Sequence, residues 1–312
     1  MSTTIIRPNS REEWLEIRRG GIGASEVPAL LGLSPFESPY GLWLRKTGRT
    51  EPKPENTAMA LGHALEGAVA QYWSEQTGRE IIKRSAIDWI VRSNERPFMQ
   101  VSPDRTYWLG DSRKPTDKAV LEIKTTQLTV DPDSLPRHWF TQLQTLLGVS
   151  EIPQGSLAWL SRGRDFGYKD IELVPDFFGW ICEETERFWK DNVLGGKEPE
   201  LTTVDDVLQK YATHTEGKIV EVSEDVFAAW QDLGVVREQL AALDERKAEL
   251  EKKLKLNFGD AEAISYQGQT LATWKTGKAS RKFDAKTFTK DYPELAGQYT
   301  HETAAVRRFL VK

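Results

Sequence analysis

A short apolar run in the middle of the chain constrains the fold most. Residues 119–123 read Ala-Val-Leu-Glu-Ile and are followed by Lys124. A run of this length and composition predicts a buried β-strand. Because side chains alternate along a strand, Glu122 and Lys124 share one face and Ile123 lies on the other. Two charges on a buried strand are costly unless a partner or an ion compensates them. The strand therefore predicts a charged site, with an exposed Glu–Lys ion pair as the alternative.

A second carboxylate precedes this strand. Asp104 follows a strand-like segment at 98–101, in the loop Ser-Pro-Asp. Mg²⁺ prefers hard oxygen ligands and retains several waters. Asp104, Glu122 and the backbone carbonyl of Ile123 would form an incomplete shell, with room for a phosphate oxygen and a hydrolytic water. Lys124 would position or deprotonate that water. This pattern indicates metal-assisted phosphodiester hydrolysis.

Three further blocks accompany these residues in chain order. They are Trp-Leu-Glu-Ile-Arg-Arg-Gly-Gly-Ile-Gly-Ala-Ser-Glu-Val at 14–27 with continuations at 30–36 and 42–48, Gly-His-Ala-Leu-Glu at 62–66, and Gln-Leu-Gln at 142–144. Together with Asp104, Glu122 and Lys124 they resemble the PD-(D/E)xK nuclease motif. The flanking sequence resembles one branch of it, the phage lambda exonuclease and YqaJ-like viral recombinase nucleases.

The resemblance implies both a fold and an activity. The fold would be α/β (α+β), a restriction-endonuclease-like core in which helices flank a mixed central sheet. The activity would be a Mg²⁺-dependent 5′-to-3′ exonuclease on linear double-stranded DNA, with Mn²⁺ as a substitute, that leaves 3′ single-stranded overhangs. Such enzymes form homo-oligomers, ring-shaped trimers among them, and pass the exposed strand to a single-strand annealing protein in phage recombination. The alternatives are a restriction-like endonuclease and an inactive DNA-end-binding recombination scaffold.

The resemblance also assigns metal-site residues in two helices. Glu66 would act on the metal directly or through water, and His63 would be a ligand only by analogy with other related nucleases. Gln142 would assist positioning. Gln144 is the second choice, because the two side chains differ in direction by roughly 200° on a helix. Where family members often have glycine after Ser-Pro-Asp, this chain has Arg105.

A phosphate-binding pair is expected near the amino terminus. Ser25 precedes a predicted helix, and a helix N-terminus with a hydroxyl and an upstream arginine can cradle a phosphate. The alternative is that Ser25 is an ordinary N-cap and Arg18 a surface charge. The resemblance assigns Arg18 and Ser25 to the 5′-terminal phosphate of DNA.

Composition excludes several other classes of site. A single cysteine, Cys182, rules out an internal disulfide and a four-thiolate metal site. A net charge of −5 argues against indiscriminate nucleic-acid binding, although a local basic channel remains compatible with it. No apolar run approaches the roughly 18 residues of a membrane span. The amino terminus lacks the basic and apolar regions of a signal peptide, so a cytoplasmic location without membrane association is expected, in a bacterial host by resemblance.

Gly-Gly-Lys-Glu-Pro at 195–199 predicts a domain boundary, with a nuclease core at 1–199 and a second module at 200–312. In the core, a helix over 58–78 is expected to bury Leu61, Leu65, Val69 and either Tyr72 or Trp73. The second module has a heptad stripe from Val222 to Leu254, broken by Lys247, followed by a small basic β module that ends in a strand near 306–311. This module would guide DNA, dock a recombination partner, or present a solvated face.

Overall fold

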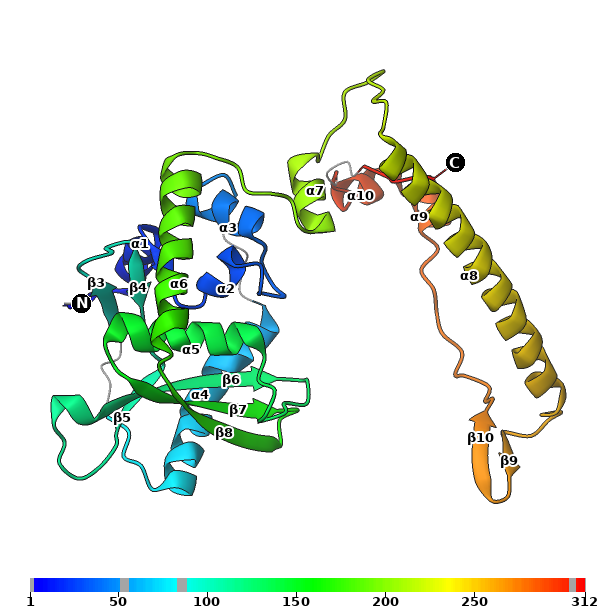
Figure 1. Ribbon diagram of the computed structural model, residues 1–312. Coiled ribbons are helices and arrows are strands. Elements are labelled where there is room, and N and C mark those ends of the chain that lie inside the picture. Colours follow the sequence, from blue (N-terminus) through cyan, green and yellow to red (C-terminus); the bar gives the residue numbers. More distant parts are fainter. Residues whose placement is uncertain (1–2, 51–55, 83–88, 303–306, 312) are drawn as a thin grey trace. The chain divides into compact units, whose positions relative to one another are not determined.

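The computed structural model describes residues 3–50, 56–82, 89–302 and 307–311. The chain divides into two compact units, Met1–Tyr211 and Ala212–Lys312 (Figure 1). The first unit extends beyond the boundary expected at residue 199. The reason is α7 (Val204–Lys210), whose Asp206 accepts a hydrogen bond from Ser38 Oγ at the start of α3 (Pro39–Lys46).

The main sheet of the first unit has four strands in the order β5-β6-β7-β8. Their bounds are β5 (Arg105–Trp108), β6 (Lys118–Thr126), β7 (Gln154–Ser161) and β8 (Asp165–Glu172), with η1 (Pro115–Asp117) before β6. β6 and β7 are parallel, and the two outer pairs are antiparallel. A parallel pair needs a crossover connection, which α5 (Arg137–Ser150) supplies. The expected mixed sheet flanked by helices is confirmed.

The two faces of β6 carry different side chains. Ala119, Leu121 and Ile123 pack with Val69 and Trp73 of α4 (Thr57–Thr77). Val120 lies in the other core cluster, with residues of α5 and α6 (Pro175–Arg187), which continues into the π-helix η2 (Phe188–Leu194). Figure 1 shows helices on both faces of the sheet. Side-chain alternation therefore places Glu122 and Lys124 on the face of α5.

A second four-stranded sheet accompanies the amino-terminal helices, in the order β1-β3-β4-β2. Its strands are β1 (Thr3–Ile6), β3 (Ile90–Ser93), β4 (Met99–Val101) and β2 (Ile22–Gly23), and the helices are α1 (Arg11–Arg19) and α2 (Val27–Leu30). β2 and β4 are parallel, so the chain after α1 runs beside the strand that leads to Asp104. This sheet brings the two predicted groups of site residues into one compact unit.

The amino-terminal half of α4 departs from the expected core pattern. Val69 and Trp73 are buried, but Leu61 is 56% and Leu65 is 37% exposed. The helix contacts the sheet with its carboxyl-terminal half. Its first turns pass the end of β6, where a Cβ on Gly62 would lie 3.3 Å from Thr125 Oγ1. The prediction that Leu61 and Leu65 belong to the core is therefore wrong for this unit.

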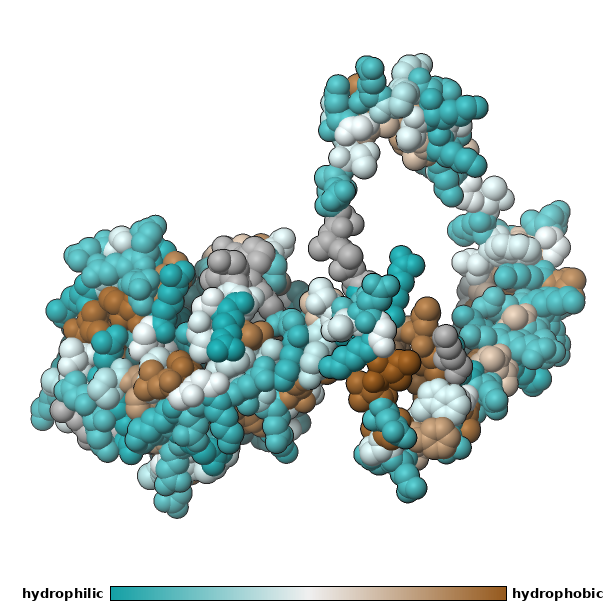
Figure 2. Space-filling model, turned by 90° about the horizontal axis from the view of Figure 1, so that it is seen from above, coloured by the Kyte–Doolittle hydropathy of each residue, from teal (hydrophilic) through white to brown (hydrophobic). Residues whose placement is uncertain are grey.

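The second unit contains one long helix and a β-hairpin. α8 (Glu224–Leu256) is followed by antiparallel β9 (Ala263–Tyr266) and β10 (Gln269–Thr273), and then by α9 (Ala285–Asp291) and α10 (Pro293–Gln298). The described residues 307–311 form no strand, so the predicted final strand is wrong there. Figure 2 shows apolar patches on a mainly hydrophilic surface. None of the helices in the described ranges is both long and apolar enough to cross a membrane.

Candidate active site

Three predicted residues meet on the α5 face of β6. Lys124 Nζ donates to Glu122 Oε1 at 2.7 Å and to Gln142 Oε1 at 2.8 Å. Gln142 Nε2 donates to Glu122 Oε1 at 2.6 Å. β6 supplies the two charged groups, two residues apart, and α5, which packs on this face of the sheet, supplies the amide of Gln142. The closed triangle fixes the direction in which each polar group points.

Asp104 joins this group from the loop between β4 and β5. Its Oδ2 accepts a hydrogen bond from the Ile123 backbone N–H at 2.8 Å. The ladder between β5 and β6 ends at the pair Arg105 and Leu121, so Ile123 lies beyond it. Within a strand, the N–H and C=O of one residue point to the same edge. The Ile123 carbonyl therefore faces the edge where Asp104 lies.

Glu122 is buried and only partly satisfied. Glu122 is 2% exposed, and its Oε2 is buried without a hydrogen-bond partner among the described residues. Burial, together with the neighbouring charge of Asp104, raises the pKa of Glu122 to about 8. Burial opposes the charge of Lys124, but Glu122 and Asp104 outweigh it and raise the pKa of Lys124. A buried carboxylate oxygen without a partner suits a divalent cation, which prefers such oxygen ligands.

Glu66 is held beside this group by an arginine. Arg105 NH1 donates to Glu66 Oε1 at 2.6 Å and to the Asp104 carbonyl at 2.5 Å. In the ranges that the structure describes, no three or more His, Cys, Asp or Glu side chains form a group that could hold a metal ion. His63, an exposed residue on α4, is therefore not brought into such a group. Sequence reasoning noted Arg105 as a departure but missed its contact with Glu66.

The hydrogen bonds of the two candidate glutamines of α5 show that they have different roles. Gln144 is fully buried, and it donates to the Glu172 carbonyl at 2.8 Å and accepts from the Val174 N–H at 2.7 Å. It therefore ties α5 to the chain after β8. Gln142 is the glutamine that faces Glu122 and Lys124, as the first choice predicted.

This division predicts different defects for the two glutamines. If the site performs the phosphodiester hydrolysis that the sequence predicts, Gln142→Ala is expected to slow it about 10- to 100-fold with little change in stability, because it removes an orienting partner of both charged groups. Gln144→Ala is expected to lower the free energy of unfolding by about 1–3 kcal/mol, because it leaves buried backbone groups unpaired. Single-turnover rates and urea unfolding of the two variants measure this. Equal defects in both assays would contradict the assignment.

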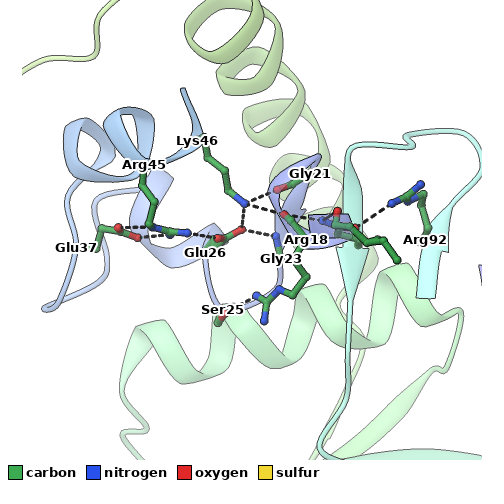
Figure 3. Close-up of polar contacts among 11 residues, drawn as sticks. Arg18, Gly21, Gly23, Ser25, Glu26, Glu37, Arg45, Lys46 and Arg92 are labelled. Carbon is green, nitrogen blue, oxygen red and sulfur yellow. Dashed lines mark hydrogen bonds and ion pairs between the residues drawn. The ribbon is translucent and has the colours of Figure 1, made fainter. Parts of the chain in front are cut away.

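The second predicted pair lies at the end of α1. Arg18 NH2 donates to Ser25 Oγ at 3.3 Å (Figure 3). Its guanidinium lies 4.6 Å from the centre of the Trp14 ring. Ser25 is exposed, but it does not cap a helix as expected. The N-cap of α2 is Glu26, and α2 has only four residues. Side chains, rather than a helix N-terminus, would therefore hold an anion at this place.

A buried carboxylate that sequence reasoning missed stands behind this pair. Glu26 accepts from Arg45 NH1 at 2.7 Å, from Lys46 Nζ at 2.8 Å and from the Gly23 N–H at 2.7 Å (Figure 3). Burial opposes its charge, but Lys46, Arg45 and Arg18 outweigh it and lower the pKa of Glu26 to about 2. The available signal was an acidic residue immediately before the apolar segment at 27–31.

Glu26 predicts a specific loss of stability in acid. Its pKa in the folded protein, about 2, lies below the ordinary value of 4.5 for a glutamate. Its contribution is therefore complete above pH 4.5 and is lost as the pH falls toward 2. A pKa shift of this size corresponds to about 3 kcal/mol. The difference in the free energy of unfolding between wild type and Glu26→Gln is therefore expected to decrease by about that amount between pH 4.5 and pH 2. Urea unfolding at successive pH values measures this difference, and a constant difference would contradict the prediction.

Comparison with known proteins identifies the family. A model described as the YqaJ-like viral recombinase domain matches residues 13–153. The uncharacterized protein YqaJ of Bacillus subtilis (strain 168) is 31% identical over 314 residues, which cover 97% of this chain and 94% of that protein. The chain belongs to the YqaJ-like viral recombinase family. The matched YqaJ-like segment contains every residue of the candidate site, from Arg18 to Gln142.

Solved structures show more distant likenesses to this YqaJ-like chain. LHK-Exo from Laribacter hongkongensis, an alkaline exonuclease, in complex with dAMP has a TM-score of 0.46 and 18% identity, covering 64% of this chain and 98% of that one. A phage-related exonuclease from Haemophilus somnus 129PT has a TM-score of 0.40 and 12% identity, covering 56% and 96%.

Proposed function

We propose that this protein is a Mg²⁺-dependent 5′-to-3′ exonuclease that degrades one strand of linear double-stranded DNA and leaves 3′ single-stranded overhangs. The observation that carries the proposal is the buried, incompletely paired Glu122 carboxylate beside Lys124 and Asp104. In a purely structural ion pair, both buried carboxylate oxygens would be expected to have hydrogen-bond partners. A site that binds a cation instead needs a carboxylate oxygen that no protein group occupies.

The residues present fit such a cation. Asp104, Glu122 and the Ile123 carbonyl would hold Mg²⁺, for which Mn²⁺ can substitute, and Glu66 would act through water beside Arg105. The bound ion would supply positive charge to the scissile phosphate. Lys124, which its raised pKa keeps protonated, would hold and orient the attacking water by donating a hydrogen bond, while Gln142 fixes the positions of Lys124 and Glu122. The ammonium also stabilises charge that develops on the phosphate oxygens.

The 5′ end would be held by the Arg18 guanidinium and the Ser25 hydroxyl. A terminal phosphate carries about −1.5 to −2 charges at neutral pH and accepts strong hydrogen bonds from arginine. The proposal also includes assembly into a homo-oligomer, a trimeric ring among the options, and transfer of the 3′ strand to a single-strand annealing protein. These last two points rest on family membership.

The test uses linear duplex DNA labelled separately at each end, with a 5′ phosphate or a 5′ hydroxyl, in Mg²⁺ or chelator. Loss of the 5′ strand from phosphorylated linear DNA, abolished by chelator and by Lys124→Ala, is expected. Cutting of a covalently closed circle would instead show a restriction-like endonuclease. DNA binding without turnover in Mg²⁺ or Mn²⁺ would refute catalysis and leave an end-binding scaffold.

A further inference from the structure

The strongest unassigned feature is the buried Glu26–Lys46 pair behind Arg18 and Ser25. The Lys46 side chain is 3% and the Glu26 side chain 8% exposed, so neither has the exposure of a group that receives a DNA end. Both nevertheless contact the segment that carries the two predicted phosphate-binding groups. Burial and contacts together indicate an indirect role.

We propose that Glu26, together with Lys46, is a positioning residue pair that sets the places of the Arg18 guanidinium and the Ser25 hydroxyl and thereby determines the preference for a 5′-phosphorylated DNA end. This inference rests on the proposed function, because it assumes that Arg18 and Ser25 receive the phosphate. It assigns Glu26 and Lys46 no contact with DNA.

The position of Ser25 is set by a turn that Glu26 closes twice. The Glu26 N–H donates to the Gly23 carbonyl at 2.9 Å, and Glu26 Oε2 accepts from the Gly23 N–H at 2.7 Å. Ser25 lies inside this reciprocal pair, with its side chain exposed. Lys46 reinforces the turn through its ion pair with the same Oε2. The direction of the Ser25 hydroxyl therefore depends on Glu26.

The position of Arg18 depends on the same pair. Lys46 Nζ donates to the Arg18 carbonyl at 3.1 Å and to the Gly21 carbonyl at 2.5 Å, which anchors the end of α1. A Cβ added to Gly23 would overlap the Arg18 guanidinium, so this group lies directly against the backbone that Glu26 holds. Trp14 packs against the same guanidinium. Figure 3 shows Arg18 and Glu26 converging on this turn.

Charge gives Glu26 a second role at this place. Three cations, Arg18, Arg45 and Lys46, gather around it, and Glu37 pairs only with Arg45 among them. Without Glu26, Arg45 and Lys46 would repel Arg18 from the turn, since Coulomb interactions are strong away from water. Glu26 reduces this repulsion. The three cations and two carboxylates keep one net positive charge, which still attracts a phosphate.

The experiment measures equilibrium binding of the full chain to 5′-phosphorylated and 5′-hydroxyl duplex ends in chelator, by fluorescence anisotropy. Glu26→Gln and Gly23→Ala are expected to reduce the ratio of the two affinities about tenfold, toward the ratio of Arg18→Ala. Gly23→Ala changes no charge, and its Cβ would overlap the Arg18 guanidinium while it lies 3.4 Å from Glu26 Oε2, an ordinary van der Waals contact. Glu37→Gln is the matched control, because it removes a carboxylate from Arg45 without touching Gly23 or Lys46, and it is expected to keep the wild-type ratio.

Glu26→Gln leaves Lys46 buried without its counter-ion, so its folding is checked by circular dichroism. The double variant Glu26→Gln with Lys46→Met replaces both charges and is expected to fold with the same loss of ratio. Folded Glu26 and Gly23 variants that keep the wild-type ratio would overturn the inference, as would a wild type without phosphate preference. DNA binding measured in the presence of chelator does not depend on hydrolysis. Failure of the proposed nuclease would appear separately, as absent turnover by a protein that still prefers phosphate.

Discussion

Lys124→Ala is expected to lower the rate of phosphodiester hydrolysis about 10²- to 10⁴-fold, the range typical of a lost general acid–base group. The ammonium donates to both Glu122 Oε1 and Gln142 Oε1, and no other cation among the described residues donates a hydrogen bond to these two oxygens. The fold is expected to survive. The ammonium lowers the pKa of the buried Glu122, so in its absence that pKa rises and the carboxyl takes up a proton instead of remaining buried as an unpaired charge.

Single-turnover release of labelled nucleotide from linear duplex DNA measures the effect. Lys118→Ala is the matched control, because it removes a lysine from the same strand at its other end, where the side chain packs over Trp108. The single-turnover rate of Lys118→Ala is expected to equal that of the wild type. Retention of the wild-type rate by a folded Lys124→Ala would exclude the proposed role of the ammonium.

Glu122→Gln is expected to abolish both hydrolysis and the stabilisation of the folded protein by Mg²⁺. An ion that binds only the folded state stabilises it by about 2.7 kcal/mol at a concentration one hundred times its dissociation constant. The amide that replaces Glu122 cannot supply the anionic oxygen that the buried Oε2 provides. The variant is therefore expected to show no Mg²⁺-dependent rise in melting temperature.

Thermal unfolding with Mg²⁺ and with chelator measures this difference without any substrate. Asp165→Asn, which removes an exposed carboxylate from β8 of the same sheet, is the control and is expected to keep the full Mg²⁺ response. An undiminished Mg²⁺ response in Glu122→Gln would show that the ion binds elsewhere. The proposed metal site would then be wrong even if hydrolysis were lost.

The period of a strand made the charged centre of the site predictable. Glu122 and Lys124 are two residues apart, so any β-strand places them on one face, and the apolar neighbours predict that this strand is buried. The structure confirms both points, with Ile123 on the opposite face. Local signals also predict the first helix, because a serine followed by two acidic residues favours a helix start and a glycine pair favours its end. α1 indeed begins after its Ser10 cap and ends before Gly20.

Other features depended on how the elements pack. The rotation of α5 about its axis determines that Gln142, and not Gln144, faces the site. Leu61 and Leu65 are exposed because the first turns of α4 extend beyond the sheet. Arg105 reaches Glu66 across 39 residues of sequence, and Lys46 reaches the Arg18 carbonyl across 28.

The sequence by itself determined the strand, its two charged groups, their shared face and the family to which the chain belongs, because periodicity and motif are local properties. Only the tertiary structure decided the partners of those groups: Gln142 for Lys124, Arg105 for Glu66, and Glu26 for the turn at Ser25. Hydrogen bonds and ion pairs between distant segments depend on the distance and orientation that packing imposes. Local sequence pattern contains neither quantity.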